Sequence, residues 1–496
     1  MKNDGKKESA ASDIMVRRGV YYPAFGIYDG VAGFYDYGPI GVRIKKRIEN
    51  QWRSLFINRT GALEIETTNI VPEVVLKASG HIDTFTDPIT NCTVCKTPFR
   101  ADKLLESYYE KKGMTEALSS VKKMSIEHME KAIRDAGTGI KCERCGNPLG
   151  KVEKFNLLFK TQVGPYGGET CYLRPETTQG IYVDFIHLYK TQGLKLPVAI
   201  AQAGPAFRNE ISPRQQLVRV REFTQMEYEM FIDPEDDPKE IFGFDIEDVL
   251  KTEINFIRSN NGDKEEILPL KELLENGNVP SKHFAFLLYL EEKLMDAIGM
   301  DKKAYRFREL EKEELPHYSK GNVDLEVKTS YGYIEVAGNA YRSDWDLSQH
   351  AKTSGQDLAI ISNEKKVLPH VVEASMGSGR LLFSLIDNCV VEDAERGWNW
   401  LRLKESVAPY RYAVFPLQKD EKLIAKAKEI HRMMLEKNTD AYYSETASIG
   451  KRYARADEIG ISHCITVDYT TLEDDTVTIR ERDTTNQIRR PFVELI

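Results

Sequence analysis

Residues 198–231 constrain the fold more than any other stretch of this 496-residue chain. Their sequence, VAIAQAGPAFRNEISPRQQLVRVREFTQMEYEMF, predicts a strand, a loop and a second strand. Successive side chains of a strand point to opposite faces. One face of the second strand therefore holds Arg221, Phe223, Gln225, Glu227 and Glu229, and the other face is mostly apolar. The polar face fits a ligand with phosphates, an aromatic base and an amine, and an ordinary solvated sheet face is the alternative.

Length and composition predict a multidomain enzyme of the cytosol. A chain of this length is expected to form about two to four domains. The 69 Lys+Arg against 77 Asp+Glu give a net charge of -8, which excludes a uniformly basic nucleic-acid binder. The sequence has no apolar run near the ~18 residues that a membrane helix needs. Its first residues, MKNDGKKESAAS, lack the apolar region of a secretory signal.

Four of the seven cysteines form two CxxC pairs, Cys92 with Cys95 and Cys142 with Cys145. Seven cysteines do not make a disulfide framework in so long a chain, so we expect a reducing compartment. Four thiolates with this paired spacing suit a tetrahedral Zn²⁺ ion. Reduced, metal-free thiols are the alternative.

Composition and periodicity divide the chain into a discontinuous core with two insertions. Within the core, Pro39 is expected to open a helix whose apolar face holds Ile44, Ile48, Trp52, Leu55 and Phe56. Near the C-terminus, the strands predicted at 411–417, 463–467 and 476–482 and the helix between the first two favour a small α/β domain. The predicted segments are a flexible N-terminal segment (1–19), the core (20–91, 151–232 and 321–400), an insertion with the paired CxxC (92–150), an acidic helical insertion (233–320) and the α/β domain (401–496).

Three further strings place charged residues beside glycines. PHVVEASMGSGR (369–380) puts Glu373 and Ser375 on one strand face, turns at Gly377 and Gly379, and opens a helix with Arg380. LRPETTQG (173–180) and SYGYIEVAGNAYRSDWDLSQH (330–350) add the side chains of Glu176, Glu335, Arg342 and Asp346. For each of these carboxylates taken singly, a solvated surface position is the alternative.

Together, these strings resemble the class II aminoacyl-tRNA synthetases, and within them the glycyl-tRNA synthetases of the archaeal and eukaryotic dimeric type. Pro39 and its helix resemble motif 1, Phe207-Arg208-Asn209-Glu210 followed by Arg219-xxx-Phe223 resembles motif 2, and Gly377-Ser378-Gly379-Arg380 resembles motif 3. Longer strings indicate the subfamily: GIYDGVAGFYDYGPIG, FRADKL (99–104), FNLLFKTQVGP (155–165), RPETTQGIYV, REFTQMEYE and RERDTT (480–485). The resemblance runs from about Val16 to Ile496.

The resemblance implies an α+β fold, with an antiparallel sheet of six to seven strands flanked by helices. The insertions would be helical and zinc-ribbon-like, and the C-terminal α/β domain would bind the anticodon. The implied activity is the ATP- and Mg²⁺-dependent activation of glycine to glycyl-adenylate and its transfer to the 3′ end of tRNA(Gly). The implied enzyme is a cytoplasmic homodimer without a membrane partner, and the Pro39 helix would lie in the dimer interface.

The resemblance also implies the site residues. Catalytic roles fall to Arg208, Glu335 and Arg380. ATP would be bound by Arg208, Asn209, Glu210, Arg219, Arg221, Phe223, Glu335, Val336, Gly377 and Arg380. Glycine would be bound by Arg100, Glu176, Gln225, Glu227, Arg342, Glu373 and Ser375. Arg208 would bridge carboxylate and α-phosphate, Phe223 and Arg380 would sandwich the adenine, and Glu335 with Glu373 would hold Mg²⁺.

Two alternatives stay open at this point. One is a non-catalytic relative that keeps the fold and binds nucleic acid as an accessory subunit. The other is a synthetase of the same subclass for threonine, proline or serine. The arginines of KRYAR (451–455) and RERDTTNQIRR (480–490) are expected to contact RNA, and for KRYAR a solvated helix start is the alternative.

Overall fold

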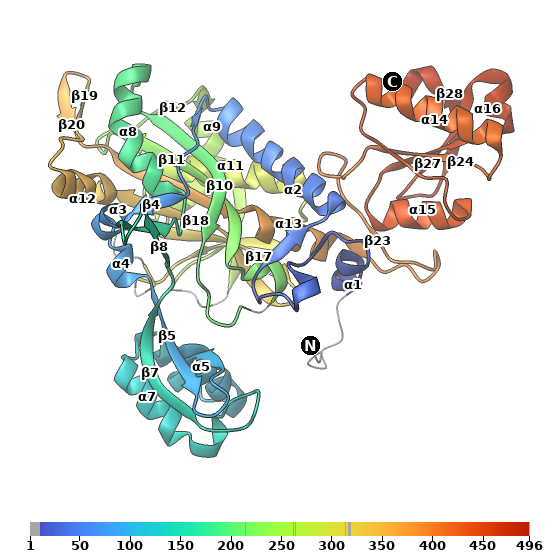
Figure 1. Cartoon of the computed structure of the whole chain (residues 1–496). Coiled ribbons are helices and arrows are strands. Elements are labelled where there is room, and N and C mark those ends of the chain that lie inside the picture. The colour runs from blue at the N-terminus through green and yellow to red at the C-terminus, as the bar shows by residue number, and fades with distance from the viewer. Residues whose placement is uncertain are drawn as a thin grey trace.

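The structure is a computed structural model that describes residues 10–213, 215–260, 262, 264–312, 314–315 and 319–495. Figure 1 shows a large body, a lobe on one side of it and a C-terminal unit on another. A nine-stranded sheet, in the order β15-β14-β16-β17-β18-β21-β11-β10-β3, runs through the large body. The pairs β14–β16 and β10–β3 are parallel and the other neighbours are antiparallel. The strands are β3 (Leu63–Glu64), β10 (Val198–Phe207), β11 (Glu222–Ile232), β14 (Glu253–Ile257), β15 (Glu265–Pro269), β16 (Tyr305–Glu309), β17 (Asn322–Thr329), β18 (Gly332–Ser343) and β21 (His370–Gly377).

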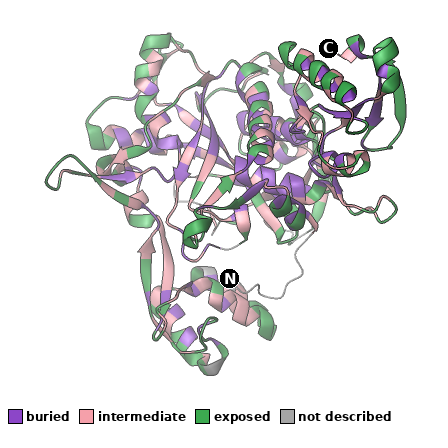
Figure 2. Ribbon diagram, turned by 45° about the vertical axis from the view of Figure 1, so that its right-hand side comes forward, coloured by how far each residue is buried: buried purple, intermediate pink, exposed green. Residues whose placement is uncertain are grey.

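The apolar face of the 198–231 hairpin is buried, as the alternation predicts. Met226, Tyr228 and Met230 of β11 lie in the main hydrophobic core. Figure 2 shows that the central strands are largely buried and that exposed residues lie on the outer surfaces of the surrounding helices. The longest helices of this core are α2 (Pro39–Trp52), α11 (Lys282–Ile298) and α13 (Ser378–Cys389), and the helices of the opposite face include α8 (Thr178–Gln192) and α12 (Trp345–Ser354).

Helix α2 begins at Pro39, as predicted. Its apolar side chains Ile44, Ile48 and Trp52 are buried in the protein's own core. A π-helical turn, η2 (Arg53–Asn58), follows directly and buries Phe56. This apolar face therefore packs within the chain and is not left free for a partner.

Residues 233–320 contain helices, as predicted, the longest of which is α11, but they also supply strands of the central sheet, so the prediction of a separate insertion is corrected. Strands β14, β15 and β16 extend one edge of the sheet, which raises the strand number from the six or seven implied to nine. The apolar run FAFLLYL (284–290), which favoured a helix, lies in α11. The other elements are β12 (Glu240–Ile241), β13 (Phe244–Asp245), α9 (Ile246–Leu250) and α10 (Leu270–Glu275).

The lobe corresponds to the predicted insertion with the paired CxxC and has a core of its own. Its three-stranded sheet, in the order β6-β5-β7, begins before residue 92 and ends after residue 150. Figure 1 shows β5 and β7 leading from the large body into the lobe. The lobe contains β5 (Thr86–Cys92), β6 (Pro98–Arg100), α5 (Ala101–Lys112), α6 (Thr115–Ser120), η3 (Val121–Lys123), α7 (Ile126–Asp135), η4 (Gly137–Gly139) and β7 (Leu149–Asn156).

The N-terminal segment is not flexible chain throughout, which corrects the prediction for 1–19. Residues 1–9 lie outside the described part, but Ala10–Arg17 form helix α1. Ile14 and Met15 of α1 are fully buried in the main core, so apolar packing holds this short helix in place. The following elements are β1 (Tyr21–Pro23), η1 (Gly26–Tyr28), β2 (Tyr35–Tyr37), β4 (Ile70–Pro72), α3 (Glu73–Ala78), α4 (His81–Thr84), β8 (Phe159–Val163) and β9 (Glu169–Leu173).

The C-terminal unit is the predicted α/β domain. Its sheet has the order β25-β24-β26-β27-β28, in which the first three strands are parallel and the last two antiparallel. Among the described residues, no helix is long and apolar enough to span a membrane. The unit contains β24 (Tyr412–Pro416), α14 (Glu421–Glu436), β25 (Ala441–Tyr443), α15 (Ile449–Glu458), β26 (His463–Val467), α16 (Tyr469–Asp474), β27 (Thr476–Glu481), β28 (Gln487–Pro491) and η6 (Phe492–Leu495). Four short strands precede it: β19 (Ile360–Ser362), β20 (Lys365–Val367), β22 (Val390–Val391) and β23 (Trp400–Leu401).

Helix α11 buries a carboxyl group between itself and the sheet. Glu291 is fully buried, and its Oε2 accepts a hydrogen bond of 2.9 Å from Nδ2 of Asn339 on β18. Burial raises the pKa of Glu291 to about 8, because the charged form loses its hydration. The folded protein therefore holds a proton on Glu291 that the unfolded chain releases at lower pH.

Glu291→Gln should make the free energy of unfolding decrease less steeply as the pH rises from about 5 to 9. A carboxyl pKa that is raised on folding contributes stability that is fully present below the unfolded pKa and is lost as the pH rises through the folded pKa, here about 8. Glutamine keeps the acceptor for Asn339 and removes the titration. Thermal unfolding midpoints of the native protein and Glu291→Gln, measured across this pH range, test this expectation. Glu275→Gln, at an exposed position of the same segment, is the control. Equal slopes for the native protein and Glu291→Gln would contradict this account.

Candidate active site

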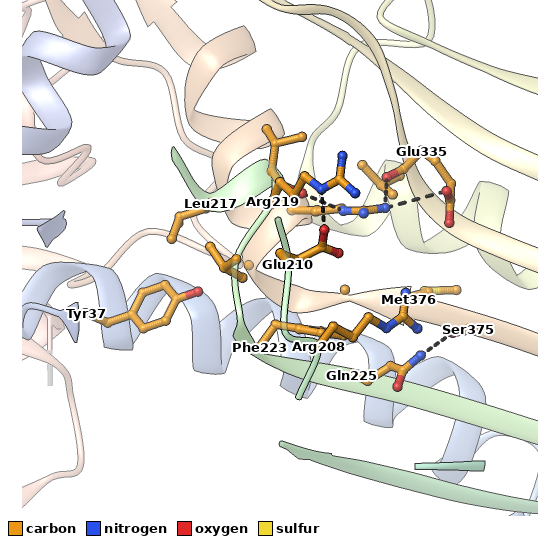
Figure 3. Close-up of a pocket in the computed structure, with 16 residues that line it drawn as sticks. Tyr37, Arg208, Glu210, Leu217, Arg219, Phe223, Gln225, Glu335, Ser375 and Met376 are labelled. Carbon is orange, nitrogen blue, oxygen red and sulfur yellow. Dashed lines mark hydrogen bonds and ion pairs between the residues drawn. The ribbon is translucent and has the colours of Figure 1, made fainter. Parts of the chain in front are cut away.

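A cavity lies at the end of the polar face of the hairpin, where β11, β18 and β21 meet the loop that follows β10 (Figure 3). Most of the residues that the resemblance implied for ATP are in its wall. The lining residues are Tyr37, Arg208, Glu210, Leu217, Val218, Arg219, Val220, Phe223, Gln225, Glu335, Val336, Ser375, Met376, Gly377, Gly379 and Arg380. Tyr37, Leu217 and Met376 were not among the predicted site residues; Tyr37 and Met376 lie within motif strings, but their side chains carry no charge that pointed to a ligand.

Arg208 presents a cation without a carboxylate partner among the described residues. Its guanidinium lies between two rings, 5.2 Å from the centroid of Phe223 and 5.4 Å from that of Phe85. Its Nε donates a hydrogen bond of 3.1 Å to the carbonyl oxygen of Pro175. The rings and the carbonyl fix the orientation of the side chain, so its positive charge stays available to an anion in the cavity.

Arg219 and Arg100 meet in an adjoining cavity that also contains Arg208 and Arg380. Arg219 Nε donates to Glu210 Oε2 at 2.5 Å, and its Nη2 lies 3.4 Å from Asp87 Oδ2. Asp87 also pairs with Arg100 at 2.8 Å, and Arg100 bonds Asp102 as well. Arg100, which was expected near the amino acid, therefore lies on the side of Arg219.

Arg221 and Asn209 do not line either cavity. Arg221 Nη1 donates to the carbonyl oxygen of Ala32 at 2.5 Å, and its Nη2 donates to that of Glu210 at 2.8 Å. The backbone N–H of Asn209 donates to the carbonyl oxygen of Leu157. Both residues shape the loop between β10 and β11 by joining it to neighbouring segments.

A buried cluster of carboxyl groups, which we call the acidic pocket, lies beside the first cavity on the same sheet face. The pairing of β11 with β21 sets Glu229 opposite Glu373 and Glu227 opposite Ser375. Carboxylate oxygens of the three glutamates lie within 4.8 Å of one another. Ser375 Oγ donates to Glu227 Oε1 at 3.0 Å and accepts from Gln225 Nε2 at 3.0 Å, which links the acidic pocket to the cavity.

Burial raises the pKa of Glu227 and of Glu229 well above the ordinary value, and the nearby Glu373 adds to this effect. Glu229 Oε2 accepts from the Tyr182 hydroxyl at 2.7 Å. The other oxygens, Glu227 Oε2 and Glu229 Oε1, have no hydrogen-bond partner among the described residues. Glu229 was placed on this face by the alternation but was absent from the set that the resemblance implied, and its spacing of two residues from Glu227 could have identified it.

One buried arginine balances part of this negative charge. Arg342 Nη1 bonds both oxygens of Glu373 at 3.1 and 3.0 Å, and its Nε and Nη2 bond those of Asp346 at 2.8 and 3.0 Å. Burial alone would raise the pKa of Glu176, but His81, Arg342 and the Gln179 amide lower it by more. The net pKa of Glu176 is below the ordinary value, so this carboxyl group stays ionised. The carboxyl groups outnumber the cations, and a bound cation would favour the ionised forms of Glu227 and Glu229, so a small cation is the ligand that this pocket suits.

The four cysteines of the CxxC pairs come together in the lobe. Their sulfur atoms lie within 4.8 Å of one another, and single pairs approach to between 3.4 and 3.5 Å. Hydrogen bonding to Thr97 lowers the pKa of Cys95 to about 6, which favours the thiolate. A Zn–S bond of about 2.3 Å in a tetrahedron requires sulfurs about 3.8 Å apart, so this donor set fits Zn²⁺.

Three arginines of the strings expected to contact RNA point into the C-terminal unit, which corrects that expectation. Arg452 is buried, and its Nη1 donates to the carbonyl oxygen of Pro416 at 2.6 Å. Arg480 forms a double hydrogen bond with Asp457 at 2.8 and 2.9 Å. Arg482 Nη1 donates to the carbonyl oxygen of Gly460. These side chains stabilise the unit because each satisfies a buried acceptor.

Comparison with protein families matches two parts of the chain. Residues 159–389 match the family described as tRNA synthetase class II core domain (G, H, P, S and T). Residues 412–496 match the family described as anticodon binding domain. The first match contains most of the residues that line the first cavity, and the second coincides with the C-terminal unit.

Curated relatives match the chain over nearly its whole length. The glycine–tRNA ligase of Aeropyrum pernix is 38% identical and covers 96% of this chain and 93% of its own length. Those of Methanocaldococcus jannaschii (35% identical, 98% and 97% covered) and Pyrococcus furiosus (38% identical, 97% and 96% covered) are similar in extent. A solved structure of Giardia lamblia prolyl-tRNA synthetase in complex with prolyl-adenylate aligns with a TM-score of 0.58 at 15% identity, covering 97% of this chain and 73% of that one, and supports the fold alone.

Arg342→Ala should lower the free energy of unfolding by about 3–5 kcal/mol, because Asp346 and Glu373 lose their buried partner. Replacing all three by neutral residues, as Arg342→Met, Asp346→Asn and Glu373→Gln, should recover most of that loss. Denaturant unfolding measures both, with the exposed Arg432→Ala as control. An Arg342→Ala variant as stable as the control would show that the buried ion pairs do not stabilise the fold.

Proposed function

The chain belongs to the glycine–tRNA ligase family of class II aminoacyl-tRNA synthetases, and we propose that it uses ATP to activate glycine and transfers the glycyl group to the 3′ end of tRNA(Gly). The supporting observation is the junction of two sites on one sheet face. A cavity with Arg208, whose cation has no carboxylate partner in the described part of the chain, adjoins the acidic pocket. The hydrogen-bonded side chains of Gln225, Ser375 and Glu227 connect the two.

Activation needs charge compensation more than proton transfer. The carboxylate of glycine is already ionised near neutral pH, so its oxygen can attack the α-phosphorus without a general base, and pyrophosphate leaves. Repulsion between the anions and their alignment form most of the barrier. Arg208 suits both tasks, because its fork can bond one carboxylate oxygen and one phosphate oxygen at once.

The rest of the cavity fits ATP. The adenine would lie between the Phe223 ring and the Arg380 guanidinium, which is held by the carbonyl oxygens of Val218 at 3.0 Å and Glu335 at 2.9 Å. Glu210 would accept from the adenine amino group. Arg219 would exchange its carboxylate contacts for the terminal phosphates. Val336 and Gly377 line the cavity as further contacts, and Asn209 and Arg221 act through the shape of the loop.

The acidic pocket fits the ammonium group of glycine. Glu176, Glu227 and Glu373 are the proposed partners, with Arg342 as counter-ion and the buried Glu229 behind them. Gln225 and Ser375 would lie at the junction, where a longer amino acid would carry its side chain. Arg100 is better placed for the nucleotide than for glycine, given its pairing with Asp87 beside Arg219.

Mg²⁺ would neutralise phosphate charge during activation. Glu335 lines the cavity with a side chain that is 51% exposed, which suits a ligand shared with the nucleotide. Glu373 is engaged by Arg342 in the acidic pocket. We therefore keep the proposed magnesium role for Glu335 and assign Glu373 to the glycine side.

In the second step, the terminal 3′-hydroxyl of tRNA attacks the carbonyl carbon of the adenylate and AMP leaves, its phosphate taking the proton. The C-terminal unit would bind the anticodon. Leu417 and Tyr469 are exposed where the parallel strands β24 and β26 end, the edge at which open α/β sheets hold ligands. Their exposed apolar and aromatic surface suits the stacking of RNA bases.

A homodimer is proposed on a different surface from the one expected. The apolar face of α2 is used within the chain, but the segment 25–31 exposes Phe25, Ile27, Tyr28 and Val31 by 54–88%. An apolar patch of this kind marks an interface between proteins. We place the enzyme in the cytoplasm, where its seven free cysteines are compatible with a reducing environment.

Glycine-dependent exchange of pyrophosphate into ATP tests the function. We expect exchange with glycine and less than a hundredth of that rate with alanine, serine, threonine or proline (on the order of 10² in kcat/KM). Exchange with none of them would favour an accessory protein, and exchange with another amino acid would contradict the glycine assignment.

Arg208→Ala should lower kcat/KM for exchange by about 10²–10³-fold, since it removes the donor aimed at the developing charge. Arg208→Lys should recover only part of the activity, because lysine is a point charge. Affinity for tRNA, measured by filter binding, should stay within about threefold. Comparable losses in exchange and tRNA affinity would instead indicate that Arg208 maintains the fold.

The cysteine cluster is proposed to hold one structural Zn²⁺, which would tie the two ends of the lobe together. Elemental analysis of the purified protein should find about one zinc per chain. Cys142→Ser should lose it, and Cys171→Ser, which alters a buried cysteine outside the cluster, should retain it. Native protein without zinc after purification in zinc-containing buffer would leave the cluster as reduced thiols.

A further inference from the structure

The loop between β10 and β11 forms one wall of the ATP cavity and contains the short 3₁₀ helix η5 (Gln216–Val218). Leu217 and Val218 of η5 line the cavity, and the carbonyl oxygen of Val218 accepts the hydrogen bond from Arg380 Nε. Arg219 follows immediately. The position of η5 therefore sets the spacing between the groups proposed for adenine and for the terminal phosphates.

The backbone enters η5 in an unfavourable conformation. Gln215 and Gln216 have φ angles of 72° and 54°, in the left-handed region that is unfavourable for a residue with a side chain. Both polar atoms of the Gln216 side-chain amide are hydrogen-bonded. Its Oε1 accepts from the Tyr21 hydroxyl, and its Nε2 donates to Ser12 Oγ at 3.1 Å. Burial raises the pKa of Tyr21, so its hydroxyl remains a donor.

Both hydrogen-bond partners of Gln216 come from the N-terminal region of the chain. Ser12 is on α1 and Tyr21 on β1, and both side chains are buried. The other end of α1 is joined to the C-terminal unit, where Arg17 Nη1 bonds Glu458 Oε1 at 2.5 Å and Arg18 bonds the second oxygen of Glu458. Glu458 is the last residue of α15 and only 4% exposed.

We propose that α1 is a positioning element of the ATP site, which holds the η5 wall through Gln216 and is itself held by Glu458 of the C-terminal unit. Gln216 is thus a positioning residue that acts through Val218 and Arg219. The docking of the C-terminal unit then influences the fit of ATP, because Gln216 and Glu458 contact opposite ends of the segment 12–18. The inference rests on the ATP-dependent activity proposed above.

The first test removes each hydrogen bond of Gln216 separately. Tyr21→Phe and Ser12→Ala should each raise KM for ATP in pyrophosphate exchange by about threefold to tenfold. KM for glycine and the thermal midpoint should not change. A purely structural role would lower the active fraction, and so kcat, at constant KM. Tyr22→Phe, at the exposed neighbour of Tyr21, is the matched control.

Calorimetric ATP binding by the native protein and the same variants distinguishes two kinds of failure. If the native protein lacks glycine-dependent exchange, the proposed function fails, but the loss of ATP affinity in the variants is still measurable. If the native protein is active and both variants keep its KM and affinity for ATP, the positioning role is overturned.

The second test is a double-mutant cycle across α1. Glu458→Gln should raise KM for ATP in the same direction, and Arg17→Gln, which weakens the ion pair from its exposed side, should do so if Glu458→Gln folds poorly. Combined with Ser12→Ala, the effect should be smaller than the product of the single effects, because both substitutions act through α1. Effects that multiply, or an unchanged KM in both ion-pair variants, would overturn the link to the C-terminal unit.

Discussion

The antiparallel pairing of β11 with β21 is the constraint on which the proposed site depends. Its register sets Glu229 opposite Glu373, Glu227 opposite Ser375 and Gln225 opposite Gly377. A slip by one residue would turn every one of these side chains to the other face. Met226, Tyr228 and Met230 prevent this slip because they are buried in the main core from the far side of the strand. Apolar packing on one face therefore determines where the polar groups meet on the other.

The same pairing concentrates carboxyl groups that water would otherwise solvate. The fold offsets only part of their charge, through Arg342 and through the Tyr182 hydroxyl. An unsatisfied buried oxygen costs free energy until a ligand supplies the missing partner. A pocket kept in this state favours a small, positively charged ligand over water, so ligand binding and the stability of the pocket depend on the same few contacts.

Much of the fold and the family membership followed from the sequence, and the exceptions have physical reasons. The alternation over 198–231 predicted both faces of β11, and the motif strings identified the family. Strands β14–β16 were missed because each is only five residues long, which is too short for its alternation to stand out beside the neighbouring helices. The buried Arg452 and Arg480 looked like RNA ligands because their acceptors, such as Asp457, are distant or unremarkable in sequence. Which predicted site residues share a cavity depends on loop geometry, which no periodicity encodes.

The lobe is joined to the body by the ribbon of β5 and β7, and such a two-stranded ribbon bends and twists more easily than a wide sheet. Asp87, which bonds both Arg100 and Arg219, lies near the body end of β5. Flexing of this ribbon would shift the Asp87 carboxylate and, with it, the two guanidinium groups that it holds. A movement of the lobe would therefore change the positions of the arginines at the phosphate end of the nucleotide cavity.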